Sequence, residues 1–163
     1  MEMLAQDIYD WCIKNDLWGD NCIYFNGKAW ASWDEWSGEK GKKIGDMLYE
    51  YEDKNPKDYF EYANPDTLSM SFEGALNHVL NGYVHGWTKL EEEFSNLFQK
   101  YNVYYEMGHA WNLSAYEIHG VRVKDPVEKA IDYCNELIEK WDRNENISDI
   151  DICYLIEILK GRE

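Results

Sequence analysis

Hydrophobic and polar residues repeat along this chain with two different periods, and the changes of period predict where helices and strands lie. Leu4, Ile8, Trp11 and Cys12 recur at helical spacing, so the pattern predicts a helix over residues 3–17. The same kind of spacing predicts further helices over residues 41–53, 75–81, 88–101, 125–141 and 148–160.

Period-two alternation and turn residues predict the strands. Asn26-Gly27 separates two aromatic-rich runs, which indicates a hairpin with strands over 22–25 and 28–33 because both turn positions favour positive φ. The run LSMSFE at 68–73 alternates between apolar and polar residues, as a half-buried strand does. The segment 103–118 has strong strand composition, and we interpret it as the central strand or hairpin of the sheet.

Two segments give weaker patterns. Residues 34–43, DEWSGEKGKK, have the composition of a loop, and 58–62 fits either a short strand or a helical turn. The predicted order is therefore α-β-β-α-β-α-α-β(β)-α-α. This order favours an α+β fold as a single domain over 1–163, with an antiparallel sheet of four to five strands and helices packed on it.

The charge of the chain restricts its partners. Acidic residues number 32 against 16 Lys and Arg, which gives a formal net charge of -16 over 163 residues. Such a charge opposes binding to nucleic-acid phosphates or to anionic lipids, because both require cationic contacts. It suits either a basic protein surface or simple solubility, and we predict no direct nucleic-acid or membrane binding.

The location of the protein is predicted from its apolar runs and cysteines. No apolar run approaches the roughly 20 residues that span a bilayer, and the N-terminus carries acids where a signal peptide carries bases. Its four cysteines, Cys12, Cys22, Cys134 and Cys153, form no C-x-x-C pair. We therefore predict a cytoplasmic protein whose cysteines are mostly buried.

Motifs for cofactors are not found in the sequence. Gly38, Gly41 and Lys42 lie in a glycine- and lysine-rich segment, but Lys43 occupies the place of the hydroxyl residue that a phosphate-binding loop requires. Dinucleotide, zinc-protease, serine-hydrolase and EF-hand patterns are also missing. We predict no cofactor and no metal site, and an enzyme is the less favoured class.

His109 is the candidate for catalysis. On a continuous strand it would share an apolar face with its neighbours, where an imidazole needs a partner, and Glu106 or Glu117 could form an acid–base pair with it. A hydrolase-like enzyme or a small-ligand-binding protein would follow. The alternatives are a hydrogen-bonded core histidine and a Gly108-His109 turn that leaves the ring in solvent, and we slightly favour the turn.

Two patterns suggest a protein-binding surface. Four acids at helical spacing line one side of the helix predicted over 125–141: Glu128, Asp132, Glu136 and Glu139. Trp33 and Trp36, with Trp30 nearby, form either part of the core or an aromatic platform for a partner. The acids form either a solvated face or a recognition stripe for a basic surface.

The leading hypothesis is a non-enzymatic interaction protein that binds a basic protein surface. In composition alone, the chain resembles the DNA-mimicking inhibitors carried by phages and mobile elements. That resemblance implies inhibition of a nucleic-acid-binding enzyme and assigns no residue. A further alternative is a structural homodimer through residues 149–160, because the last predicted helix is apolar nearly all round.

Overall fold

The structure is a computed structural model that describes residues 1–118 and eight positions between 131 and 143. The chain divides into two compact units, Met1–Val121 and Arg122–Glu163, and the fold below is that of the first. Described positions from 131 to 140 are helical, in the segment where the helix over 125–141 is predicted. The helix predicted over 148–160 lies outside the described residues, so the homodimer stays a prediction, and so does the single domain.

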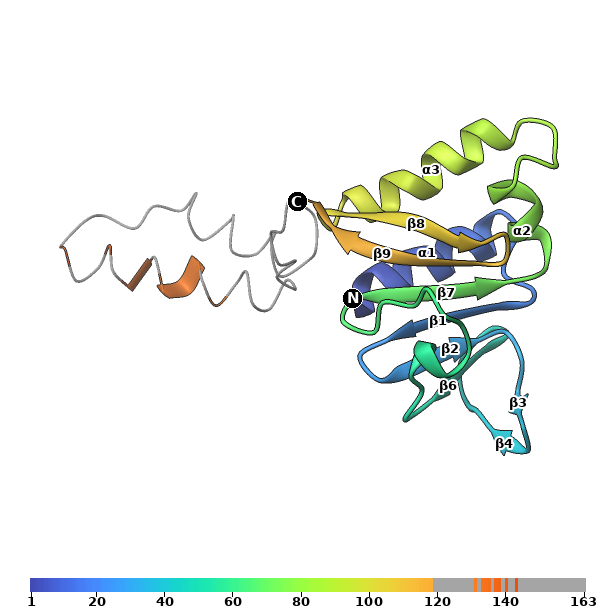
Figure 1. Ribbon diagram of the computed structural model, residues 1–163. Helices are drawn as coiled ribbons and strands as arrows, with labels where there is room; N and C mark the ends of the chain where they lie inside the picture. Colours follow the sequence, from blue (N-terminus) through green and yellow to red (C-terminus); the bar gives the residue numbers. More distant parts are fainter. Residues whose placement is uncertain (119–130, 132, 136, 139, 141–142, 144–163) are drawn as a thin grey trace. The chain divides into compact units, whose positions relative to one another are not determined.

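The first unit is built on one antiparallel sheet of seven strands in the order β5-β6-β2-β1-β7-β9-β8 (Figure 1). The strands are β1 (Asn21–Phe25), β2 (Lys28–Ala31), β5 (Lys42–Gly45), β6 (Leu48–Tyr51), β7 (Leu68–Phe72), β8 (Val103–His109) and β9 (Asn112–Glu117). The α+β class with an antiparallel sheet is therefore confirmed, but the prediction of four to five strands is wrong.

The extra strands come from the segment that the sequence pattern assigned to a helix and a loop. Residues 41–53 form the β5–β6 hairpin, and residues 34–43 contain a small separate pair, β3 (Glu35–Trp36) and β4 (Glu39–Lys40). Gly41 lies close against Tyr51 of β6, because a Cβ there would lie 2.6 Å from Cζ of Tyr51. The predicted helix rests on the spacing of four apolar residues, Ile44, Met47, Leu48 and Tyr51. Ile44 and Met47 are exposed, whereas Leu48 and Tyr51 are buried.

The three α-helices of the first unit, over the residues that the structure describes, lie where the periodicity predicts them. They are α1 (Glu2–Lys14), α2 (Ala75–Leu80) and α3 (Trp87–Gln99), and a single 3₁₀ turn, η1 (Pro56–Asp58), lies between β6 and β7. Residues 58–62 thus begin as a helical turn and form no strand. The predicted strands over 22–25, 28–33 and 68–73 correspond to β1, β2 and β7.

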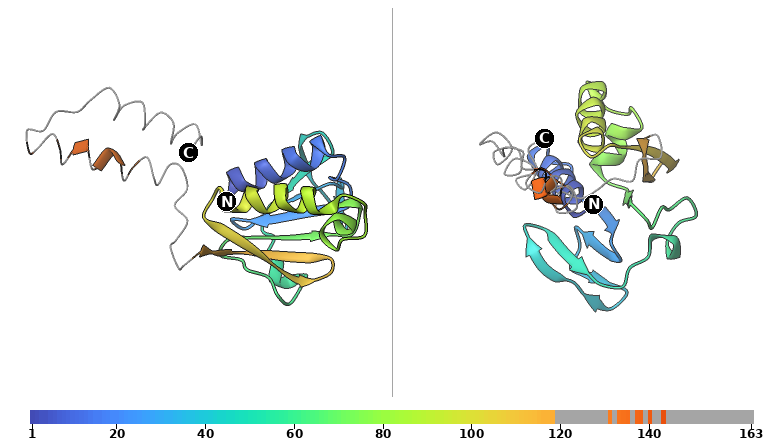
Figure 2. Two further views of the ribbon diagram at one scale, coloured as in Figure 1. Left: turned by 90° about the horizontal axis from the view of Figure 1, so that it is seen from above. Right: turned by 90° about the vertical axis from the view of Figure 1, so that its left-hand side faces the viewer.

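The helices cover one face of the sheet, and strand alternation decides which residues meet them. Tyr105 of β8 points to the helices, because its ring centroid lies 5.4 Å from that of Phe94 and 5.0 Å from that of Phe98 in α3. The cross-strand pairs Met70–Leu113 and Ile23–Met70 belong to that face. In Figure 2, α1 and α3 lie side by side on this one face of the sheet.

The segment 103–118 is a hairpin, as one of our two interpretations predicts, but it does not occupy the centre of the sheet. β8 is an edge strand, and β1, whose five residues are all buried, has three strands on each side. Low charge in 103–118 was therefore a poor guide to position, because an edge strand can be as neutral as a central one.

Candidate functional site

The face of the sheet opposite the helices carries a connected set of rings, which we call the aromatic array. Each ring centroid lies between 4.8 and 5.9 Å from that of a neighbour in the set. Its members are Trp33, Trp36, Tyr51, Tyr59, Tyr24, Phe60, Trp111, His109 and Tyr62.

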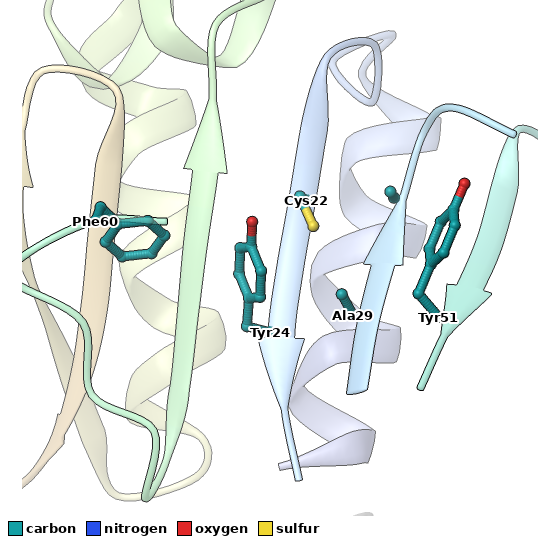
Figure 3. Packing of buried hydrophobic residues seen from close by; sticks show 6 residues of the cluster. Cys22, Tyr24, Ala29, Tyr51 and Phe60 are labelled. Atoms are coloured by element: carbon teal, nitrogen blue, oxygen red, sulfur yellow. The ribbon is translucent and has the colours of Figure 1, made fainter. Parts of the chain in front are cut away.

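Small side chains on the sheet make room for the array. Cys22, Ala29 and Ala31 are fully buried on this face, and the rings of Tyr24 and Tyr51 pack among them (Figure 3). Larger side chains at these positions would displace the rings, because protein interiors are close-packed. The sequence of β1 and β2 therefore shapes the floor on which the array rests.

A hydroxyl and amide network fixes the segment that crosses this floor and carries Tyr59, Phe60 and Tyr62. Ser69 of β7 and Ser114 of β9 share a hydrogen bond of 2.9 Å, and Ser114 Oγ donates to the carbonyl of Tyr62 at 2.8 Å. Asn64 Nδ2 donates to the carbonyl of Ala115 at 2.8 Å. Because most of these groups are buried, the bonds hold the crossing segment in one position.

Some rings of the array are buried and others are exposed. Tyr24 is 3% exposed and Phe60 is 6% exposed, whereas Tyr59 is 41% and Tyr62 is 50% exposed. Burial raises the pKa of Tyr24, so its hydroxyl stays protonated and serves as a hydrogen-bonding group rather than an acid. The exposed rings are anchored on a rigid base, which suits contact with a partner.

Trp33 and Trp36 lie in this array, but the neighbouring Trp30 does not. The rings of Trp33 and Trp36 are half-buried, with centroids 5.8 Å apart. Trp30 lies on the other face of the sheet, where its indole N–H donates to Glu50 Oε2 at 3.1 Å. Trp30 thus belongs to the core, and Trp33 and Trp36 pack on a core cluster while staying partly accessible. Their role as a platform for a partner stays a prediction.

His109 is exposed, and a β-bulge sets its direction. The register of β8 and β9 shifts between Met107 and His109, so that Gly108 is the extra residue and His109 pairs with Asn112. The bulge moves His109 to the array face, where its ring stacks on Trp111 at 5.7 Å and meets Tyr62 at 5.2 Å. The interpretation of a continuous strand with His109 on the apolar face is therefore wrong, and the chain turns at 110–111, two residues later than the predicted Gly108-His109 turn.

The structure brings only one of the two proposed carboxylates to the side of His109. Glu106 pairs with Ser114 and faces the array side, next to a cavity of about 170 Å³ that Tyr62 and Tyr116 also line. Glu117 pairs with Val103 and faces the helices. A triad of His109, Glu106 and Glu117 therefore does not form, because the two carboxylates project from opposite faces of one hairpin.

The acids of the predicted recognition stripe, Glu128, Asp132, Glu136 and Glu139, lie outside the described residues. In the described part, the excess of acid is nevertheless large. Residues 1–118 contain nine Lys and no Arg against 21 Asp and Glu, a net charge of -12. Within this range, ion pairs to lysine hold four of these carboxylates: Asp7, Glu39, Glu50 and Glu93.

Sequence reasoning missed most of the array. The signal was present in DYFEYANP at 58–65, where three aromatic residues fall between two Asn-Pro pairs. Nothing local shows that these rings reach Tyr24 and Trp111, because the contacts join positions far apart in the chain. Lys54 was also missed, although its ammonium lies 5.2 Å from the centroid of the Trp36 ring.

Comparisons of the chain with protein-family models, with curated proteins and with solved structures found no match. Over the residues that the structure describes, no helix is both long and apolar enough to cross a membrane. The same residues contain no group of three or more His, Cys, Asp and Glu placed to hold a metal ion. The absence of cofactors stays a prediction.

Proposed function

We propose that this protein is a non-enzymatic binding protein that docks a basic protein surface against the aromatic array. The observation that carries the proposal is the combination of exposed, anchored rings with a net charge of -12 on the described unit. The surface of a nucleic-acid-binding enzyme is the kind of target that this combination suits, and occupying it would inhibit that enzyme.

The rings supply the affinity in this proposal. Tyr and Trp side chains bury a large area with little loss of rotational freedom, and they are enriched among residues that dominate binding energy. Tyr59 and Tyr62 are exposed to about half of their area, yet both belong to segments that the array and the Ser69–Ser114 network hold in place. These side chains therefore lose little conformational entropy when a partner covers them.

The charge supplies selectivity. A negative potential attracts Lys and Arg surfaces, accelerates their encounter and repels phosphates and acidic proteins. Aromatic faces complement the same partners, because a guanidinium or ammonium group over a ring gains cation–π attraction. The array already shows this contact internally, since the Lys54 ammonium lies over the rings of Trp36 and Tyr51 at 5.2 and 5.8 Å.

Binding of a fluorescein-labelled, arginine-rich 12-residue peptide, measured by anisotropy between about 50 and 300 mM NaCl, tests the proposal. The affinity should fall several-fold as salt rises. Tyr62→Ser should weaken binding about fivefold or more, because it removes an exposed ring of the array. Tyr83→Ser is the matched control, since Tyr83 is 71% exposed but belongs to the loop between α2 and α3.

The proposal would be wrong if affinity stayed constant with salt, or if Tyr62→Ser and Tyr83→Ser behaved alike. A second readout tests the inhibitor version directly. The protein should release labelled duplex DNA from a basic DNA-binding protein while leaving the DNA itself unbound.

A further inference from the structure

A cavity of about 370 Å³ opens next to the aromatic array, where the β1–β2 hairpin meets the chain that follows β6. The residues that line it include Tyr24 and Phe25 of β1 together with Pro56 and Pro65. Ligand sites for drug-sized molecules have volumes of roughly 300 to 1,000 Å³, so this cavity suits one side chain or one small ring. Tyr24 belongs to both the array and the cavity wall, which makes the two continuous.

The backbone builds this cavity before any ligand arrives. Gly27 and Asp53, at its edge, both have left-handed φ values of 75° and 53°. The Lys54 amide donates to the Gly27 carbonyl at 2.9 Å, which ties the hairpin turn to the turn after β6. Asn55 Oδ1 accepts from the Lys57 amide at 3.0 Å and caps η1. A preformed cavity of this kind loses little entropy on binding.

The charges around the cavity favour a cation. Lys54 lines the cavity, but its ammonium forms an ion pair with Glu39 at 2.6 Å and lies over the rings of Trp36 and Tyr51. These three partners do not line the cavity, so the ammonium is engaged elsewhere. The bond to Glu39 raises the pKa of Lys54, so the pair stays neutral overall. Asp53 is exposed and makes no ion pair within residues 1–118. Its carboxylate is therefore the charged lining group that is left for a ligand.

We infer that this cavity is a binding site for the arginine side chain of a protein partner. The inference rests on the proposed function and names the group that the partner inserts. A guanidinium is planar and weakly hydrated, so it can pack against Tyr24 and the prolines that line the cavity while it donates to the Asp53 carboxylate. A lysine ammonium is compact and strongly hydrated, so it gains less from the same walls.

Two peptides of 12 residues that differ only in carrying Arg or Lys test the site by anisotropy. The wild-type protein should bind the Arg peptide several-fold more tightly. Asp53→Asn should weaken Arg-peptide binding about tenfold, because a hydrogen bond to a charged group is lost. Asn also tolerates a left-handed φ, so the turn should survive this substitution.

Asp58→Asn is the matched control, because Asp58 is an exposed acid of η1 that does not line the cavity. It removes the same charge and should cost at most about twofold. Equal losses for the two variants, or equal affinities for the two peptides, would overturn the arginine site and leave the proposed function standing. Binding of neither peptide would overturn both. Amide NMR shifts at Gly27 and Asn55 should accompany binding of the Arg peptide.

Discussion

Replacing Gly108 by Ala should destabilise the protein through the bulge that directs His109. A Cβ on Gly108 would lie 2.4 Å from Asn112 Oδ1 and 2.8 Å from Tyr62 Cβ, both closer than real Cβ contacts. Gly108 has no left-handed φ, so the cost is steric rather than conformational. Asn112 is fully buried and therefore has little freedom to move aside.

The magnitude follows from these contacts. Forcing one extra methyl group into a close-packed site costs about 1–3 kcal/mol. If Asn112 rotates away, the hydrogen bond that its Oδ1 accepts from the His109 amide at 3.0 Å is also lost, which adds about 1 kcal/mol. The expected decrease in the free energy of unfolding is thus about 2–4 kcal/mol.

Urea unfolding followed by far-UV circular dichroism measures this change. With a denaturant slope of about 2 kcal/mol/M, the midpoint should fall by about 1–2 M. Gly19→Ala is the control, because nothing lies within 4 Å of a Cβ there and the expected change is within about 0.5 kcal/mol.

A double-mutant cycle locates the cause. Gly108→Ala should cost clearly less in an Asn112→Ala background, because the shortest contact is then absent. A Gly108→Ala protein within about 0.5 kcal/mol of the wild type would refute the reasoning. Equal costs in the two backgrounds would show that Asn112 is not the obstacle.

Three further predictions concern the helix face and the buried groups. Phe94→Ala should lower the free energy of unfolding by about 3–5 kcal/mol in the same assay, because the Phe94 ring is fully buried. The indole N–H of Trp30, and then Lys28, lower the pKa of Glu50 despite partial burial. Ionised Glu50 therefore contributes stability that is fully present above its unfolded pKa of about 4.3 and is lost as pH falls through the folded pKa. The difference in free energy of unfolding between the wild type and Glu50→Gln should consequently shrink below about pH 4. Burial raises the pKa of Cys12, whose side chain is inaccessible, so a thiol reagent at pH 8 should modify it only after unfolding.

Each of these predictions has its own contradicting result. A Phe94→Ala protein as stable as the wild type would mean that α3 does not cover the sheet as described. A stability difference for Glu50→Gln that grows on acidification would reverse the sign of the pKa shift. Rapid modification of Cys12 in the native protein, mapped by mass spectrometry, would contradict its burial.

Local patterns were sufficient for the elements whose signals are local. Asn26 and Gly27 both have left-handed φ, as the hairpin requires, and the alternation in 68–72 places Met70 on the helix face. The pattern failed over 41–53, where Leu48 and Tyr51 are buried by strand pairing although their spacing also fits a helix. Glycines at 41 and 45 were the available counter-signal, because glycine is a poor helix former.

The candidate site was less accessible to sequence reasoning than the fold. Alternation alone puts His109 on the helix face, and a single inserted residue, Gly108, reverses this direction. The cavity depends on Phe25, Asp53 and Pro65, which come from three separate segments of the chain. Such a site follows from long-range packing, so only the charge and the richness in aromatic residues could indicate it beforehand.

The position of β7 has a consequence for the order of folding events. The β1–β2 and β8–β9 hairpins join neighbouring segments, whereas β7 pairs with β1 and β9 across about 40 to 50 residues. Closing loops of this length is entropically costly before the pairings form, so insertion of β7 is the slow step that contact order predicts. Until β7 is inserted, no hydrogen-bonded pairing among residues 1–118 joins the four strands β5-β6-β2-β1 to the hairpin β9-β8. The edges of β1 and β9 that β7 will occupy stay unpaired during that time. The lifetime of those edges during synthesis would set how readily the newly made chain aggregates.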